Sequence, residues 1–153
     1  MFKRWLGDRD RAGQRASGGI GLFVDGPNVL REPFDTDLHQ VREVVSGRGR
    51  LRLARLYLDH RASTGLIQAG EAAGFEIHIT SGDVDVTLAV DATSAIERDE
   101  LDGIAIATRD IDFKPVIELA RRRGLQTIVV APGEVGRSTG LTAVADEAIL
   151  LEG

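Results

Sequence analysis

Short apolar runs that alternate with segments of helical spacing constrain the fold of this chain more than any other feature. The apolar runs occupy residues 20–24, 51–58, 75–79, 103–107, 125–130 and 148–151. Strands that alternate with helices of about 10–15 residues are joined by right-handed crossovers and form a parallel sheet. The sequence therefore predicts an α/β fold: one three-layer α/β/α domain with a central, mostly parallel sheet.

Turn and cap residues place the helix boundaries between these runs. The expected helices cover residues 38–45, 63–74, 85–100 and 113–123, with a loop and a short helix over 136–145. Asp35 to Asp37 offer N-caps for the first helix, and Ser63 or Thr64 offers one for the second. Gly74 suits the position just after a helix. The alternating pattern of residues 75–79 predicts a strand near a sheet edge.

Composition restricts the classes of protein that need to be considered. The 153 residues suit one domain, and 42% of them are hydrophobic with a mean hydropathy of −0.07, as in a soluble protein. No apolar stretch approaches the roughly 20 residues of a membrane span, and the first residues lack a signal-peptide core, so we expect a cytoplasmic protein. The absence of cysteine excludes disulfides and thiolate metal sites, so any metal needs oxygen or histidine ligands.

Charge is distributed unevenly along the chain. The net charge is −5, yet residues 1–19 carry five basic and two acidic side chains. We expect residues 1–19 to form a basic, flexible arm ahead of a domain over 20–153. Such an arm could follow a phosphate backbone, and the alternative is a solvated tail without a binding role.

Aspartates cluster at three places that follow predicted strands. Asp25 ends the first run, Asp83 and Asp85 follow the third within a few residues, and Asp110 and Asp112 follow the fourth. The carboxyl ends of parallel strands meet at one edge of a sheet, so these side chains should converge. Crowded carboxylates repel one another unless a cation or a shared proton compensates them. A hard cation such as Mg²⁺ or Mn²⁺ is the simplest solution.

The aspartates differ in how well they suit the role of metal ligand. Asp25, Asp85 and Asp110 are the best candidates, and Asp112 is a fourth carboxylate that acts directly or through water. Asn28 can orient a phosphate or a water without adding negative charge. Structural alternatives stay open, because Asp25 could make an Asx turn and Asp110 or Asp112 could cap the following helix.

Other polar residues are assigned to structural or surface roles. Asp83 precedes a helix and can cap it, while Asp91 lies on a different face of that helix from Asp85. His60 follows a strand and is interpreted as a surface residue. Neither a Gly-x-Gly-x-x-Gly nor a Gly-x-Ser-x-Gly motif follows a predicted strand, which argues against a nucleotide-cofactor enzyme and a serine hydrolase.

Taken together, these motifs resemble the NYN domain, a branch of the PIN-like nuclease superfamily. The matching segments, in order, are residues 23–28, 82–91, 108–116 and 123–124. The resemblance covers about residues 20–151 and is greatest to stand-alone archaeal NYN proteins. It implies a PIN-like fold with a parallel sheet, acidic metal ligands and Mg²⁺- or Mn²⁺-dependent ribonuclease activity.

The resemblance also assigns roles to individual positions. The residues that match the catalytic and metal-binding pattern of the family are Asp25, Asn28, Asp85, Asp110 and Asp112. Arg109 replaces the glycine of the Ser-Gly-Asp form common in the family. A cation at this position could bind RNA phosphate or neutralise an empty metal site.

Two functions follow as expectations. The first is a ribonuclease that hydrolyses RNA phosphodiesters through a metal-activated water held by the aspartates, with one or two Mg²⁺ or Mn²⁺ ions. The second is an RNA-binding or regulatory module that keeps the fold without turnover. A haloacid dehalogenase-type phosphatase would need Asp-x-Asp after the first strand, where this chain has Asp25-Gly26-Pro27, and a Toprim domain would need glutamate there. A homodimer is also left open.

Overall fold

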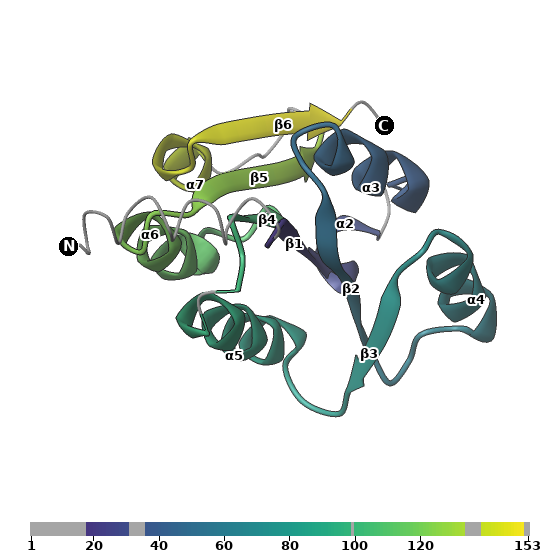
Figure 1. The fold of residues 1–153 in the computed structure, drawn as a ribbon. Helices are drawn as coiled ribbons and strands as arrows, with labels where there is room; N and C mark the ends of the chain where they lie inside the picture. The colour runs from purple at the N-terminus through teal and green to yellow at the C-terminus, as the bar shows by residue number, and fades with distance from the viewer. Residues whose placement is uncertain (1–17, 31–35, 99, 134–138, 152–153) are drawn as a thin grey trace.

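The sheet predicted from the apolar runs has six strands, and all of them are parallel (Figure 1). The computed structural model describes residues 18–30, 36–98, 100–133 and 139–151. The strands are β1 (Ile20–Asp25), β2 (Leu51–Asp59), β3 (Glu76–Thr80), β4 (Gly103–Ala107), β5 (Gln126–Pro132) and β6 (Glu147–Leu151). Each predicted run therefore overlaps a strand, and the α/β prediction is confirmed.

Helices cover both faces of this sheet and give the three expected layers (Figure 1). They are α2 (Gly26–Val29), α3 (Leu38–Ser46), α4 (Thr64–Ala72), α5 (Val84–Glu97), α6 (Lys114–Arg122) and α7 (Thr139–Val144), with a 3₁₀ turn η1 (Ile111–Phe113) before α6. The helices α3 and α4 lie on one face, and α5, α6 and α7 lie on the other. The single-turn helix α2 was expected only as a turn, and Pro27 in its first turn favours the helical start.

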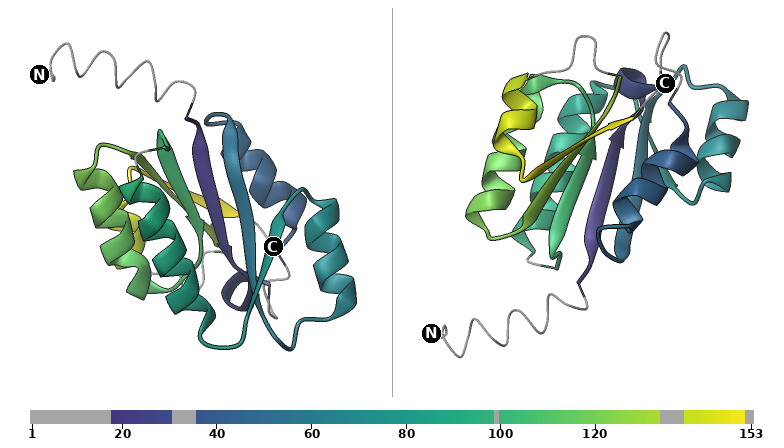
Figure 2. Two further views of the ribbon diagram at one scale, coloured as in Figure 1. Left: turned by 60° about the horizontal axis from the view of Figure 1, so that its bottom comes forward. Right: turned by 90° about the horizontal axis from the view of Figure 1, so that it is seen from above.

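The order of the strands explains where a ligand site can form. The order is β3-β2-β1-β4-β5-β6, so the chain first winds outward from β1 to β3 and then restarts at β4 on the other side of β1 (Figure 2). In open parallel sheets, ligands bind at the carboxyl ends of the strands where the winding reverses. The strands before Asp25 and Asp110 are neighbours in the sheet, as their apolar sequences predicted.

Side chains of β1 contribute to a separate apolar core on each face, because alternate residues of a strand point in opposite directions. All six residues of β1 are buried. Phe23 packs with Leu88 and other residues of the face covered by α5 to α7. Leu22 and Val24 pack with Val41 of α3 on the opposite face. A strand buried on both faces is held firmly, so Asp25 at its end has a fixed position.

Several predicted boundaries are confirmed by hydrogen bonds and backbone angles. The side chain of Asp37 accepts hydrogen bonds from the N–H groups of His39 and Gln40, and that of Ser63 accepts one from Leu66. Gly74 follows α4 with φ of 92°. The predicted arm at 1–19 lies outside the described residues except for its last two positions. Within the described part of the chain, no helix has both the length and the apolar character needed to cross a lipid bilayer.

Candidate metal centre

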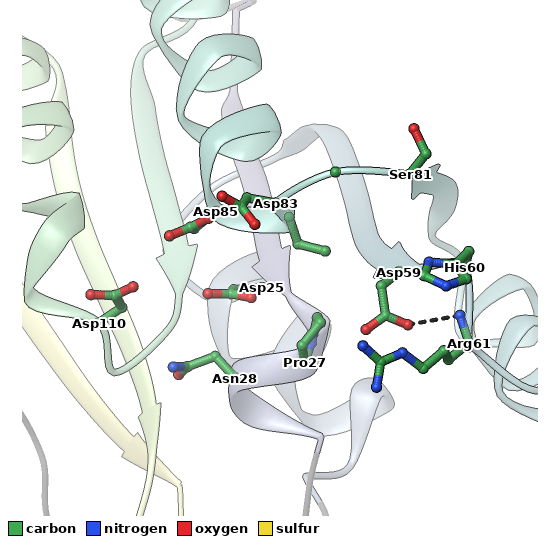
Figure 3. Close-up of a pocket in the computed structure, with 12 residues that line it drawn as sticks. Asp25, Pro27, Asn28, Asp59, His60, Arg61, Ser81, Asp83, Asp85 and Asp110 are labelled. Atoms are coloured by element: carbon green, nitrogen blue, oxygen red, sulfur yellow. Dashed lines mark hydrogen bonds between the residues drawn. The ribbon is translucent and has the colours of Figure 1, made fainter.

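A crevice of about 440 Å³ opens at the carboxyl edge of the sheet, at the reversal between β1 and β4. Its walls include Asp25 at the end of β1, Asn28 in α2, Arg61 after β2, Asp85 at the start of α5, and Asp110 after β4. Figure 3 shows the carboxylates of Asp25, Asp85 and Asp110 directed toward a common space. The convergence expected from parallel strands therefore occurs.

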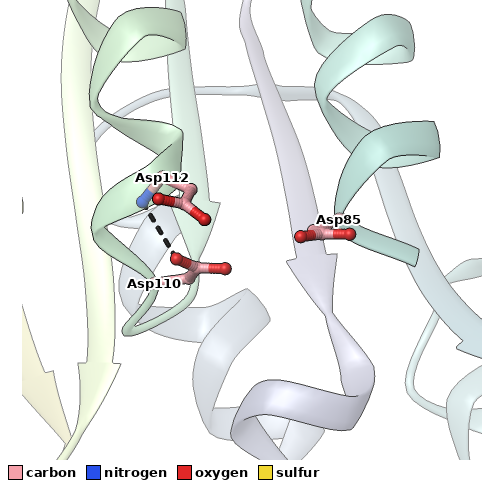
Figure 4. Close-up of side chains that lie close together, drawn as sticks. All are labelled: Asp85, Asp110 and Asp112. Carbon is pink, nitrogen blue, oxygen red and sulfur yellow. Dashed lines mark hydrogen bonds between the residues drawn. The ribbon is translucent and has the colours of Figure 1, made fainter. Parts of the chain in front are cut away.

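Three of the predicted aspartates form the tightest group. Carboxylate oxygens of Asp85, Asp110 and Asp112 all lie within 4.8 Å of one another (Figure 4). Asp85 belongs to the first turn of α5, whereas Asp110 and Asp112 belong to the loop and the 3₁₀ turn after β4. Asp85 and Asp110 are half-buried, and Asp112 is exposed. Such a group of oxygen donors with access to water suits Mg²⁺ or Mn²⁺, which keep several water ligands.

Asp25 lies deeper than these three residues. It is 4% exposed, and the Thr108 hydroxyl Oγ1 donates a hydrogen bond of 3.2 Å to its Oδ2. Burial raises the pKa of Asp25 to about 6, and the negative charges of Asp110 and Asp85 act in the same direction. A buried carboxylate that is costly to ionise beside two others is the electrostatic setting that a divalent cation relieves. The four aspartates predicted as ligands thus fit a hard cation, with Asp25 behind the other three.

Thr108 and Asn28 fix the loop that carries Asp110. The Thr108 hydroxyl accepts a hydrogen bond of 3.1 Å from the Asp110 N–H, so one side chain joins the end of β1 to the loop after β4. The side-chain oxygen Oδ1 of Asn28 accepts a hydrogen bond of 2.7 Å from the Arg109 N–H. The amide nitrogen of Asn28 is then the part of this side chain that can donate to a ligand. The side chain of Arg109 is not among those that line the crevice.

Asp110 also caps the turn that positions Asp112. Its Oδ1 accepts a hydrogen bond of 2.9 Å from the Asp112 N–H. Capping and metal binding are compatible roles for Asp110, because one carboxylate has two oxygens and several lone pairs. The cap uses Oδ1 and leaves Oδ2 for the crevice.

Asp91 holds α5 against the sheet from a different face of the helix. The hydroxyl of Tyr57 on β2 donates a hydrogen bond of 2.7 Å to Asp91 Oδ2. Burial and the nearby Asp91 carboxylate raise the pKa of Tyr57, so this hydroxyl keeps its proton. Because Asp85 is carried by the same helix, the Tyr57–Asp91 hydrogen bond helps to fix the position of Asp85.

Two further residues line the crevice, Asp83 and His60. Asp83 occupies the N-cap position of α5, as predicted, but its side chain makes no capping hydrogen bond. His60 is exposed and lies in the wall of the crevice.

Three residues of this region were not identified from the sequence. Thr108, Asp59 and Arg61 are hard to recognise in a sequence, because a single threonine, or an acid beside a base, carries little signal by itself. Their positions directly after predicted strands contained the information, since any side chain at a parallel strand end faces the same edge.

Comparison with known proteins agrees with this architecture. The family model described as "NYN domain" matches residues 19–152. The uncharacterised protein MJ0482 of Methanocaldococcus jannaschii is 47% identical over 130 residues, which cover 85% of this chain and 54% of that protein. The chain therefore spans about half the length of this curated relative.

A solved structure supports the fold independently. The crystal structure of VPA0982 from Vibrio parahaemolyticus, described as a protein of unknown function, superposes with a TM-score of 0.73. The similarity covers 86% of this chain and 91% of that chain at 22% sequence identity, a level at which only the fold is compared. With the family match extending from the start of β1 to the end of β6, the chain belongs to the NYN domain family, within the PIN-like superfamily.

Proposed function

We propose that this chain is a divalent-metal-dependent ribonuclease. The observation that carries the proposal is the group of three carboxylates within 4.8 Å, supplied by two separate elements at the reversal point of an NYN fold. PIN-like proteins are generally nucleases, and a phosphodiester needs positive charge near its oxygens during hydrolysis.

In this proposal, Asp85, Asp110 and Asp112 would hold Mg²⁺ or Mn²⁺, and the buried Asp25 would be a further oxygen donor. Such a cation, when bound, lowers the pKa of a water and offsets the charge of the phosphodiester. The amide nitrogen of Asn28 would donate a hydrogen bond to a phosphate oxygen. Thr108 fixes the position of the Asp110 loop relative to the end of β1 through its two hydrogen bonds.

Cleavage of labelled RNA in the presence of Mn²⁺ tests the proposal. We expect the wild-type protein to cleave single-stranded or structured RNA, EDTA to stop the reaction, and Asp110→Asn to lower the rate at least about 100-fold, because a metal ligand and its charge are lost. Glu118→Gln on the exposed face of α6 makes the same charge change and should keep the activity.

The outcome separates the ribonuclease from the binding module. Equal cleavage by the wild-type protein and Asp110→Asn would refute the assignment of this site. RNA binding without any metal-dependent loss of RNA would refute the nuclease and favour a module that only binds. Titration with Mg²⁺ and Mn²⁺ in the same assay identifies the preferred ion.

A further inference from the structure

A second, apolar pocket of about 180 Å³ adjoins the crevice. Leu30, Leu58, Ala62 and Leu66 supply carbon surface to its wall, while Pro27, Asp59 and Arg61 line both cavities. The two spaces therefore share one rim, with the aspartates on one side and the apolar pocket on the other.

The size and lining of this pocket suit part of a ligand. Sites for whole small molecules usually measure roughly 300–1,000 Å³, so a pocket of about 180 Å³ accepts a smaller group. Because the wall is mainly apolar, that group would be held mainly by dispersion forces and the hydrophobic effect. A flat ring with apolar faces meets the two conditions of small size and apolar contact. If the ring is attached to a charged chain, that chain can continue into the crevice.

Arg61 provides the charge at the shared rim. Its side chain is exposed and reaches back toward Pro27, beside the carboxylate of Asp59 (Figure 3). The Asp59 Oδ1 accepts a hydrogen bond of 2.9 Å from the Arg61 N–H, and the Asp59 carbonyl accepts one of 3.1 Å from Ala62. These bonds hold the loop after β2 in a tight turn, and Arg61 on this turn lines both cavities. Asp59 offsets part of its charge, so the apolar pocket has to supply much of the affinity.

We propose that the apolar pocket binds one nucleobase of the RNA strand, on one side of the phosphodiester that lies at the aspartates, and that Arg61 contacts a phosphate between them. This assignment rests on the proposed ribonuclease for the position of the cleaved bond. The binding of the base itself depends only on the pocket and on Arg61.

Binding measurements with a non-cleaving protein test the pocket. In the Asp110→Asn background with Mg²⁺ present, a short single-stranded RNA is compared with versions that carry one abasic ribose, moved position by position. We expect one position at which loss of the base weakens binding about tenfold, since burial of a base on an apolar surface is worth about one factor of ten or more. The other positions should change binding much less.

A variant that fills the pocket links this effect to its residues. Ala62→Trp should weaken the intact RNA about tenfold and should remove the further loss caused by the abasic position. Ala148→Trp introduces the same side chain at an exposed position of the edge strand β6, at the far edge of the sheet, and should bind like the parent protein. If urea unfolding shows that Ala62→Trp is misfolded, Leu66→Asn replaces it, because a polar group in the wall also disfavours a base.

Arg61→Gln tests the phosphate contact separately. It should weaken the binding of all RNAs of the series equally. It should also reduce the magnitude of the negative slope of log affinity against log salt by about 0.7, the value for one phosphate contact to a single strand. Arg122→Gln, at the C-terminal end of α6, should leave this slope unchanged.

The outcomes distinguish this inference from the proposed function. A uniform response to abasic positions, or an Ala62→Trp variant that binds like its parent, would overturn the base pocket. Position-dependent binding in a protein whose wild type does not cleave RNA would support the pocket and refute the nuclease. An unchanged salt slope in Arg61→Gln would overturn the phosphate contact.

Discussion

Replacing Asp25 by asparagine should stabilise the metal-free protein at neutral pH, even though it removes a group of the proposed metal centre. Asp25 is buried and its pKa is about 6, against an ordinary value of 3.8. Between these two values the folded state binds more protons than the unfolded state at this site. Folding stability therefore falls as the pH rises from 3.8 to 6, and the full penalty is present above pH 6.

The size of the effect follows from the two pKa values. A difference of about 2 pKa units, at about 1.4 kcal/mol each, gives a penalty of about 3 kcal/mol at pH 7.5. At pH 5 the folded carboxyl is mostly protonated, and about half of this penalty remains. Asparagine has no such charge, and its side-chain oxygen still accepts the hydrogen bond from Thr108.

Urea unfolding in EDTA measures this difference. We expect Asp25→Asn to exceed the wild type by about 3 kcal/mol at pH 7.5 and by about 1.5 kcal/mol at pH 5, with Glu118→Gln as a control for the loss of one charge. Saturating Mg²⁺, at about 1,000 times its dissociation constant, should add about 4 kcal/mol to the wild type and less to the variant. A variant that is less stable than the wild type in EDTA at pH 7.5, or a difference that does not change with pH, would refute this reasoning.

The remaining predictions concern groups that position the site. Tyr57→Phe removes the 2.7 Å hydrogen bond to Asp91 and leaves that carboxylate without this donor, so urea unfolding should show a loss of about 1–2 kcal/mol; an unchanged midpoint would contradict it. Gly26→Ala would place a Cβ 2.5 Å from the Tyr57 carbonyl oxygen and 2.6 Å from Leu58 Cδ2, which should cost at least about 2 kcal/mol in the same assay. Gly82→Ala is the matched control, because a Cβ there has no heavy atom within 4 Å from any described residue other than its two neighbours in the chain.

Most of the fold could be predicted because local pattern and tertiary position agree in this chain. The uninterrupted apolar sequence of residues 20–24 required burial on both faces, and β1 lies in the middle of the sheet. The alternating residues 75–79 required one polar face, and β3 lies at an edge. The helix α2 was missed because Asp25-Gly26-Pro27-Asn28 has the composition of a turn. In the folded protein, Val29 packs into the core and the Leu30 N–H donates to the Gly26 carbonyl, so the turn closes as one turn of helix.

The location of the site could be predicted from the sequence, but the relative burial of its carboxylates could not. Parallel strands bring their ends together whatever the side chains are, so the convergence of the aspartates followed from the pattern. The burial of each carboxylate did not follow from the pattern, because it depends on how far each strand and turn extends. Asp112 joins Asp85 and Asp110 through the short turn that Asp110 itself caps, while Asp25 is buried beside Thr108.

The central position of β1 has a consequence for the order in which the chain folds. One neighbour, β2, follows β1 closely, whereas Thr108 at the end of the other neighbour, β4, is 83 positions away from its partner Asp25. During synthesis, an apolar strand therefore keeps one open edge until β4 has left the ribosome, and long-range pairings of this kind form slowly. The carboxylates meet only when this pairing has closed. If the proposed cation site is correct, it would therefore form only after the middle of the sheet is complete, and cation binding would report that step.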